Sequence, residues 1–214
     1  MTAPDTATGA TRAADSLQDI LDMAVTVEML GITLVGAGLD SNARGNFDPP
    51  IPPPLVAVLM AARGQEKAHY DFFRSLGGRP LVQEFHVPDP ALLTDPNVFF
   101  GALQVEEARE TAAHIAALAV FTALERPDLV KVSSQYAAEE AEHRLLTNYA
   151  AGARPANNYA FSPNLYQNAT DILADLRQQG IIEGSGPAAK FPGPGEIDFT
   201  NVTELTPGGA VVAF

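Results

Sequence analysis

Two short motifs in the chain pair a glutamate with a histidine three residues later: Glu66 with His69, and Glu140 with His143. On an α-helix, residues at this spacing lie within about 60° of each other on adjacent turns. A carboxylate and an imidazole held in this way can bind one metal ion. The motifs therefore predict a metal site on one face of each helix that carries them.

Two other predicted helices supply further carboxylates. Glu28 is the one acidic residue in the apolar run 23–39, and Glu107 precedes Glu140 at nearly the spacing by which Glu28 precedes Glu66. The chain thus resembles a weak repeat, in which a helix with one glutamate is followed by a helix with Glu-x-x-His. Ionised groups on a core-facing stripe are costly unless they are paired or bind metal. We therefore expect six metal ligands: Glu28, Glu66, His69, Glu107, Glu140 and His143.

The third predicted helix contains weaker candidates on the same face. Glu110 and His114 follow Glu107 on that face, and Glu106 is an alternative to Glu107 as the ligand. For His114 a position on the polar face or a hydrogen-bonded position is favoured over metal ligation. Tyr70 and Tyr136 are expected to be core residues that lie near the site.

The types of the expected ligands indicate the metal. Two divalent ions carry four positive charges, which four carboxylates neutralise, and each histidine completes the shell of one ion. Oxygen and imidazole ligands suit iron and manganese and leave positions open for oxygen or peroxide. The chain has no Cys, so a thiolate site, a zinc ribbon and a Cys-bound iron–sulfur cluster are excluded.

Four long helices must position these residues. Apolar residues at three- and four-residue spacing predict helices over about 14–39, 55–76, 96–124 and 128–152, with Pro- and Gly-rich segments between them. The link 125–127 is so short that the last two helices must form an antiparallel hairpin. The long link 77–95, with a short extended patch at 81–85, allows a crossover. The predicted fold is all-α: an antiparallel four-helix bundle with one long crossover.

The remaining sequence is assigned to the two ends of the chain. Residues 1–13 are expected to form a flexible lead-in, and residues 14–152 to form the bundle. Residues 153–214 are rich in Pro and Gly. We expect them to form an irregular C-terminal extension that packs on the bundle and contains one short helix around 164–179.

At these motifs the sequence resembles the ferritin-like superfamily, and most closely its branch of desiccation-related proteins. The resemblance rests on QEKAHYDFFRSLGGRP (65–80) and AAEEAEHRLL (137–146), and it extends over about 14–152. It implies a four-helix bundle with a dinuclear metal site, in which the six expected ligands match the ligand positions of the family. The long C-terminal extension and the proline-rich link between the first two helices depart from cage-forming ferritins.

Composition limits the partners. The 13 basic and 26 acidic residues give a formal net charge of −13, which argues against nucleic-acid and anionic-lipid binding. The sequence contains no run of about 18 consecutive apolar residues, so no membrane span is predicted. The N-terminal segment lacks an apolar signal region, so a cytoplasmic location is expected as the chain is written, or a secreted or periplasmic one if a signal was removed. A homodimer is compatible with the sequence.

Two functional hypotheses remain. The first is a dinuclear iron or manganese protein that oxidises bound metal or removes peroxide, a ferroxidase- or catalase-like oxidoreductase acting in oxidative and desiccation stress. Its small-molecule substrate would be oxygen or peroxide. The second is a metal-free structural or stress-protection protein without catalysis. In that case Glu66 and His69 would pair with Arg63 or Lys67 at the surface, and Glu28 would be a lone buried acid or a dimer contact.

Overall fold

The computed structural model describes residues 14–203 and 206–209, and it is mainly α-helical. The helices are α1 (Leu17–Ala43), α2 (Pro53–Ser75), α3 (Pro96–Ala123), α4 (Pro127–Ala150) and the short α5 (Ile172–Gln178). Two 3₁₀ turns (Pro90–Leu93 and Ala169–Asp171) and two strands, β1 (Glu84–His86) and β2 (Ala188–Lys190), complete the regular structure of the described residues. The prediction of a mainly α-helical chain is confirmed.

The helix ends follow from local chemistry. Ser16 caps α1 through a reciprocal capping box with Asp19. At the start of α3, the Asp95 carboxylate accepts a hydrogen bond from the backbone N–H of Asn97 at 2.8 Å. Gly152 follows α4 with a φ of 95°, a left-handed conformation that favours glycine. The ends of all four long helices lie within a few residues of the sequence prediction.

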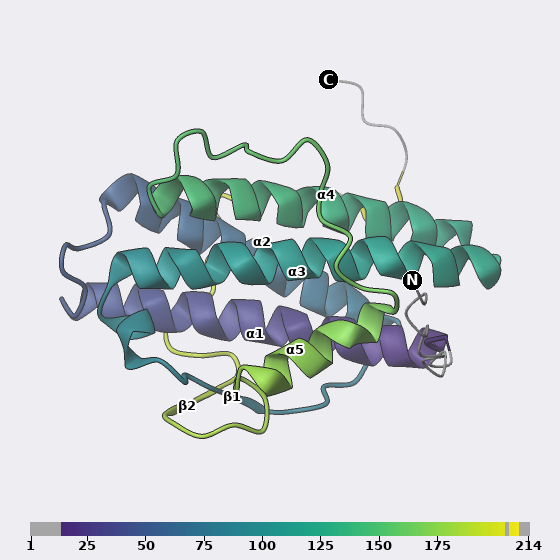
Figure 1. Cartoon of the computed structure of the whole chain (residues 1–214), viewed down its shortest axis with the longest axis horizontal. Coiled ribbons are helices and arrows are strands. Elements are labelled where there is room, and N and C mark those ends of the chain that lie inside the picture. Colours follow the sequence, from purple (N-terminus) through teal and green to yellow (C-terminus); the bar gives the residue numbers. More distant parts are fainter. Residues whose placement is uncertain (1–13, 204–205, 210–214) are drawn as a thin grey trace, which may run out of the picture.

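The four long helices form two antiparallel hairpins that lie side by side (Figure 1). One hairpin is α1 with α2, and the other is α3 with α4. The segment 76–95 runs back along the molecule, so that α2 and α3 point in the same direction (Figure 1). Only residues 124–126 separate α3 from α4, as the short predicted link requires.

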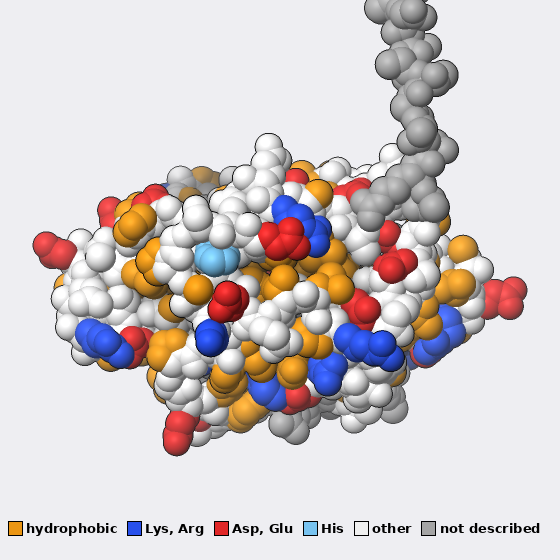
Figure 2. All heavy atoms as spheres, turned by 90° about the horizontal axis from the view of Figure 1, so that it is seen from below, with side chains coloured by type: hydrophobic (Ala, Val, Ile, Leu, Met, Phe, Trp, Pro, Cys, Tyr) orange, Lys and Arg blue, Asp and Glu red, His pale blue; other side chains and the backbone are white. Residues whose placement is uncertain are grey.

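A small sheet ties the crossover to the C-terminal extension. β1 pairs antiparallel with β2, and Phe85 stands opposite Ala189. The sequence predicted an extended patch near β1 but no strand at β2, because the pairing joins segments about 100 residues apart. Figure 2 views the molecule from the side of these strands, where acidic and basic side chains are interspersed with apolar ones.

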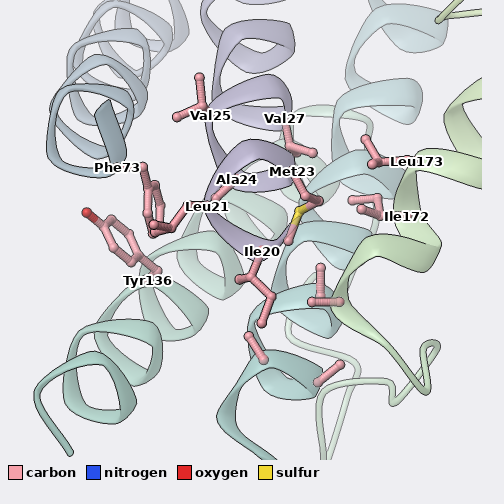
Figure 3. Close-up of a cluster of buried hydrophobic side chains, with 14 of the residues drawn as sticks. Ile20, Leu21, Met23, Ala24, Val25, Val27, Phe73, Tyr136, Ile172 and Leu173 are labelled. Atoms are coloured by element: carbon pink, nitrogen blue, oxygen red, sulfur yellow. The ribbon is translucent and has the colours of Figure 1, made fainter. Parts of the chain in front are cut away.

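Two apolar clusters fill the interior. The larger cluster gathers residues of α1 and α5 with Phe73 of α2 and Tyr136 of α4, whose rings lie close together (Figure 3). The smaller cluster, near the other end of the hairpins, contains Leu59 and Phe99. On α2, Glu66 lies between Leu59 of one cluster and Phe73 of the other. The candidate ligands therefore occupy a polar layer that apolar side chains enclose on both sides.

The C-terminal extension is anchored by a buried arginine. Arg63, 2% exposed, donates hydrogen bonds to the backbone oxygens of Pro192 at 2.7 Å and Glu196 at 3.3 Å. It also donates to the backbone oxygen of Ile32 at 3.1 Å. Its guanidinium thus joins α1, α2 and the extension. Carbonyl oxygens satisfy the donors of this buried cation, whose pKa burial lowers.

α1 has the length and apolar composition that a membrane-crossing helix needs, although the sequence contains no uninterrupted apolar run of that length. In the structure, 78% of its most apolar window is buried within the protein. Such burial is typical of a core helix. α1 also lies near the N-terminus, where signal sequences of similar composition occur.

Candidate metal centre

The structure brings the six sequence-predicted ligands together in the polar layer. Four helices contribute them: Glu28 from α1, Glu66 and His69 from α2, Glu107 from α3, and Glu140 and His143 from α4. They form two groups of four residues, and within each group the ligand atoms lie within 4.8 Å of one another. The first group is Glu28, Glu66, His69 and Glu140, and the second is Glu66, Glu107, Glu140 and His143.

Two carboxylates belong to both groups. Glu66 is 2% exposed and Glu140 is fully buried. Each has two oxygens, so each can offer one oxygen to either group. Glu28 and Glu107 each belong to one group, as do His69 and His143. The arrangement is symmetric: two carboxylates are shared, and each group adds one further carboxylate and one imidazole of its own.

Each imidazole faces the carboxylates of its own group through Nδ1. His69 Nδ1 lies 3.4 Å from Glu28 Oε2 and 3.1 Å from Glu140 Oε1. His143 Nδ1 lies 3.0 Å from Glu140 Oε2, 3.1 Å from Glu66 Oε1 and 3.7 Å from Glu107 Oε2. One nitrogen therefore points at three oxygens, which is the convergence that a metal ion requires of its ligands.

Several of these atoms lack a hydrogen bond. Among the described residues, seven buried side-chain oxygen or nitrogen atoms have no hydrogen-bond partner, and five of them belong to the six candidate ligands. His69 Nδ1 and Glu140 Oε1 are both among them, although only 3.1 Å separates them, because the two groups are not aligned for a hydrogen bond. An unsatisfied buried polar atom costs about 1–3 kcal/mol. Atoms that point into a shared space fit metal ligation.

Burial and mutual repulsion set the protonation of the glutamates. Burial raises the pKa of Glu28 well above its usual range, and the charges of Glu66 and Glu140 raise it further. Burial also raises the pKa of Glu107, against the opposing effect of His143. Both shifts favour the protonated form of Glu28 and Glu107.

The pKa values of Glu140 and His143 instead shift toward the charged forms, against the effect of burial. Burial alone would raise the pKa of Glu140, but the hydrogen bond from His143 and the nearby imidazoles of His143 and His69 hold it well below its usual range. Burial alone would lower the pKa of His143, but Glu107, Glu140 and Glu66 together raise it well above its usual range. An imidazolium at His143 thus stands in for part of the positive charge that the carboxylates need.

Two residues outside the predicted set support the site. Gln65 Oε1 lies 3.0 Å from His143 Nε2 and holds that nitrogen as a donor, so that Nδ1 faces the carboxylates. At Gly31, a Cβ would lie 3.0 Å from Glu66 Oε2, so α1 needs glycine there for the carboxylate to fit. Both positions had a sequence signal, because Gln65 adjoins Glu66 and Gly31 lies one turn after Glu28.

The weaker candidates lie outside both groups. Glu110 is 3% exposed, and burial raises its pKa, reinforced by Glu66 and Glu140. His114 stacks on Tyr136 at a centroid distance of 5.3 Å, and its Nδ1 lies 3.4 Å from Ser133 Oγ. Of the two favoured positions for His114, the structure shows the hydrogen-bonded one, and the ring is buried rather than on the polar face. Glu106 instead pairs with Arg109 at 2.5 Å.

The surface-pairing alternative for Glu66 is wrong. Glu66 is buried, and the donors of Arg63 go to backbone carbonyls. Lys67 pairs instead with Asp71 at 2.5 Å. Glu28, at 1% exposed, lies neither alone nor at the surface.

A surface groove reaches the first group. It has a volume of about 480 Å³ and is lined by His69, Tyr136 and Glu139 together with Phe199 and Val202 of the C-terminal extension. The rings of His69 and Tyr136 meet edge to face, with centroids 4.3 Å apart. The groove provides a path from solvent to the His69 side of the site.

Comparisons of the chain with protein-family models, curated proteins and solved structures gave no match. The functional interpretation therefore depends on the geometry of the buried cluster.

Proposed function

We propose that this chain is a ferritin-like four-helix bundle that binds two divalent ions, iron or manganese, and acts in metal oxidation or peroxide removal under oxidative and desiccation stress. One observation carries the proposal: six ligand residues from four helices converge as two groups that share Glu66 and Glu140. The direction of the helices, with a long crossover between α2 and α3, supports the ferritin-like assignment.

The residues of the chain have distinct roles in this proposal. Glu66 and Glu140 would help to hold both ions, while Glu28 with His69 and Glu107 with His143 would each help to hold one. When bound, two such ions supply Lewis acidity and redox chemistry toward oxygen or peroxide. Gln65 fixes the orientation of His143, and the apolar clusters on either side limit water around the carboxylates.

The metal-free structural alternative is less well supported. It would require the fold to keep four buried glutamates together with several unpaired polar atoms and no compensating ion. Each such atom costs stability, and a scaffold has no need of them. A purely structural role would favour apolar residues at the same positions.

Metal analysis tests the proposal. The full chain is refolded either with Fe²⁺ under anaerobic conditions or with Mn²⁺. Unbound metal is then removed, and the metal content of the protein is measured. We expect two ions per chain in the wild type and a marked loss in Glu66→Ala and Glu140→Ala. Glu142→Ala is the matched control, because Glu142 lies on the exposed face of α4. Fewer than one ion per wild-type chain, or full metal content in both site variants, would contradict the proposal.

A further inference from the structure

A small cavity lies against the second group of candidate ligands, away from the groove at His69. Its volume is about 20 Å³, and all four long helices line it. Glu107 and His143 are part of its lining. Leu146 of α4, 38% exposed, also lines it, so the lining includes both buried candidate ligands and a partly exposed side chain. We call this cavity the apolar slot.

The slot offers a polar guest almost no partners. Besides Glu107 and His143, its one polar side chain is Thr147, whose hydroxyl already donates to the backbone oxygen of His143 at 2.8 Å. The nitrogens of His143 face Gln65 and the carboxylates. Glu107 Oε2 is the remaining unpartnered atom. A buried water makes about three hydrogen bonds, so the slot cannot satisfy one.

Size restricts the guest further. A cavity needs about 10–15 Å³ to hold a water-sized molecule, so the slot of about 20 Å³ holds one very small molecule. Apolar cavities stay dry and take up apolar guests. Hydrogen peroxide is small enough, but Glu107 Oε2 is the one free acceptor of the lining, so at least one of the two hydroxyl groups would stay unpaired. Dioxygen is small and carries no donor.

We propose that the apolar slot binds dioxygen and presents it to the Glu107–His143 side of the buried cluster. The inference rests on the proposed function and names dioxygen, rather than peroxide, as the molecule that this side of the site receives. Water-soluble species have a separate path, because the groove at His69 is wider and is lined by Gln65, Gln135 and Glu139.

The experiment uses the paramagnetism of dioxygen on the metal-free full-length chain. Proton relaxation of leucine methyl groups is measured by NMR under nitrogen and under dioxygen pressure. Leu59 and Leu103 line the slot, whereas Leu129 and Leu176 are equally buried in the larger cluster and serve as internal references. We expect the dioxygen-induced relaxation of the slot methyls to be several-fold larger than that of the references.

Variants locate the effect. Ala62→Val and Ala150→Val each add two methyl groups to the slot lining, in α2 and α4 respectively. Either should reduce the relaxation of the slot methyls to the reference level. Ala57→Val is the control, because Ala57 is exposed on α2 and has the same change in helix propensity. Melting curves verify that each variant is folded, and the second slot variant keeps the test decisive if one fails to fold.

The outcomes separate cleanly. Equal relaxation of slot and reference methyls in the wild type would overturn the inference, as would folded slot variants that behave like the wild type. Magnetisation transfer from water to Leu59 and Leu103 would also overturn it, because the slot would then be wet. The measurement needs no metal, so a failed dioxygen result leaves the metal count intact, and a failed metal count leaves the dioxygen result intact.

Discussion

Glu66 of α2 and Glu140 of α4 are the two carboxylates that both groups of candidate ligands share. The two residues lie far apart in the sequence. His69, three residues after Glu66, belongs to the first group, and His143, three residues after Glu140, belongs to the second. The two hairpins are thus joined at their centre through a pair of acidic side chains that serve both groups at once.

Replacing a glutamate that both groups share should cost more bound metal than replacing a glutamate that belongs to one group. Glu66→Gln removes a charge from both groups, so we expect it to retain fewer than one ion per chain. Glu28→Gln affects one group and should retain about one ion, because the group around His143 is complete without it. Elemental analysis of the refolded variants distinguishes the two. Equal losses in both variants would show that the two groups bind metal only as a unit.

Metal binding should release protons and weaken at low pH. The raised pKa values of Glu28, Glu107 and His143 mean that the metal-free site holds protons that an ion must displace. Affinity therefore rises with pH until these groups are deprotonated in the free protein. Calorimetric titration with Mn²⁺ in two buffers of different ionisation enthalpy measures the release. We expect at least one proton per chain, and an identical enthalpy in both buffers would refute this prediction.

Gly31 should control metal affinity without being a ligand. Gly31→Ala would bring a methyl group to 3.0 Å from Glu66 Oε2 and push that carboxylate out of position. We expect metal affinity to fall about 10-fold, as is typical when a supporting contact of a ligand is lost. Gly101→Ala is the matched control in α3, because no atom lies within 4 Å of the added methyl. The control should bind metal normally and gain up to about 1 kcal/mol of stability.

Glu110 should prove dispensable for metal binding. It lies outside both groups, yet one of its buried oxygens has no partner. Glu110→Gln should keep two ions per chain and raise the unfolding free energy of the metal-free protein at pH 8 by about 1–2 kcal/mol, because the raised pKa of Glu110 favours the unfolded chain at this pH and Gln does not titrate. Denaturant titration and metal analysis measure the two effects. Loss of an ion would instead identify Glu110 as a seventh ligand.

His114 should make the protein less stable in acid. Burial lowers its pKa from 6.5 to about 4, so between these values the unfolded chain binds this proton and the folded chain does not. Stability from this histidine is present above pH 6.5 and is lost as pH falls toward 4, by roughly 3 kcal/mol. His114→Phe keeps an aromatic ring beside Phe73 and Tyr136 and should flatten this part of the pH profile. His86→Phe, at the strand β1, should keep the wild-type profile in the same denaturant series.

The sequence predicted those features that depend on neighbouring residues. Prolines at the starts of α3 and α4, and glycines after α2 and α4, set the helix boundaries, because these residues act locally. The two Glu-x-x-His pairs of candidate ligands also followed from local spacing, since Glu66 and His69 must share a helix face wherever the helix lies. Glu28 and Glu107 were instead predicted from the weak repeat and from their place in apolar helices.

Other features required the folded backbone. Arg63 resembled a surface partner for Glu66, because sequence does not show that carbonyls of Pro192 and Glu196 would reach it. The three-residue strand β2 has no local signal, and its partner β1 lies about 100 positions earlier. The apolar slot arises where four helices leave a gap, and no pattern within one helix encodes such a gap.

The anchoring of the extension by Arg63 also orders events during synthesis. The carbonyls of the extension that Arg63 binds belong to residues 129 to 133 positions later in the chain. At about 5–20 residues per second, a ribosome needs roughly 6–26 s to add them. Phe199 and Val202, which wall the groove at His69, emerge later still. Until the extension is added, the groove at His69 lacks the wall that Phe199 and Val202 form, so its lining is completed last.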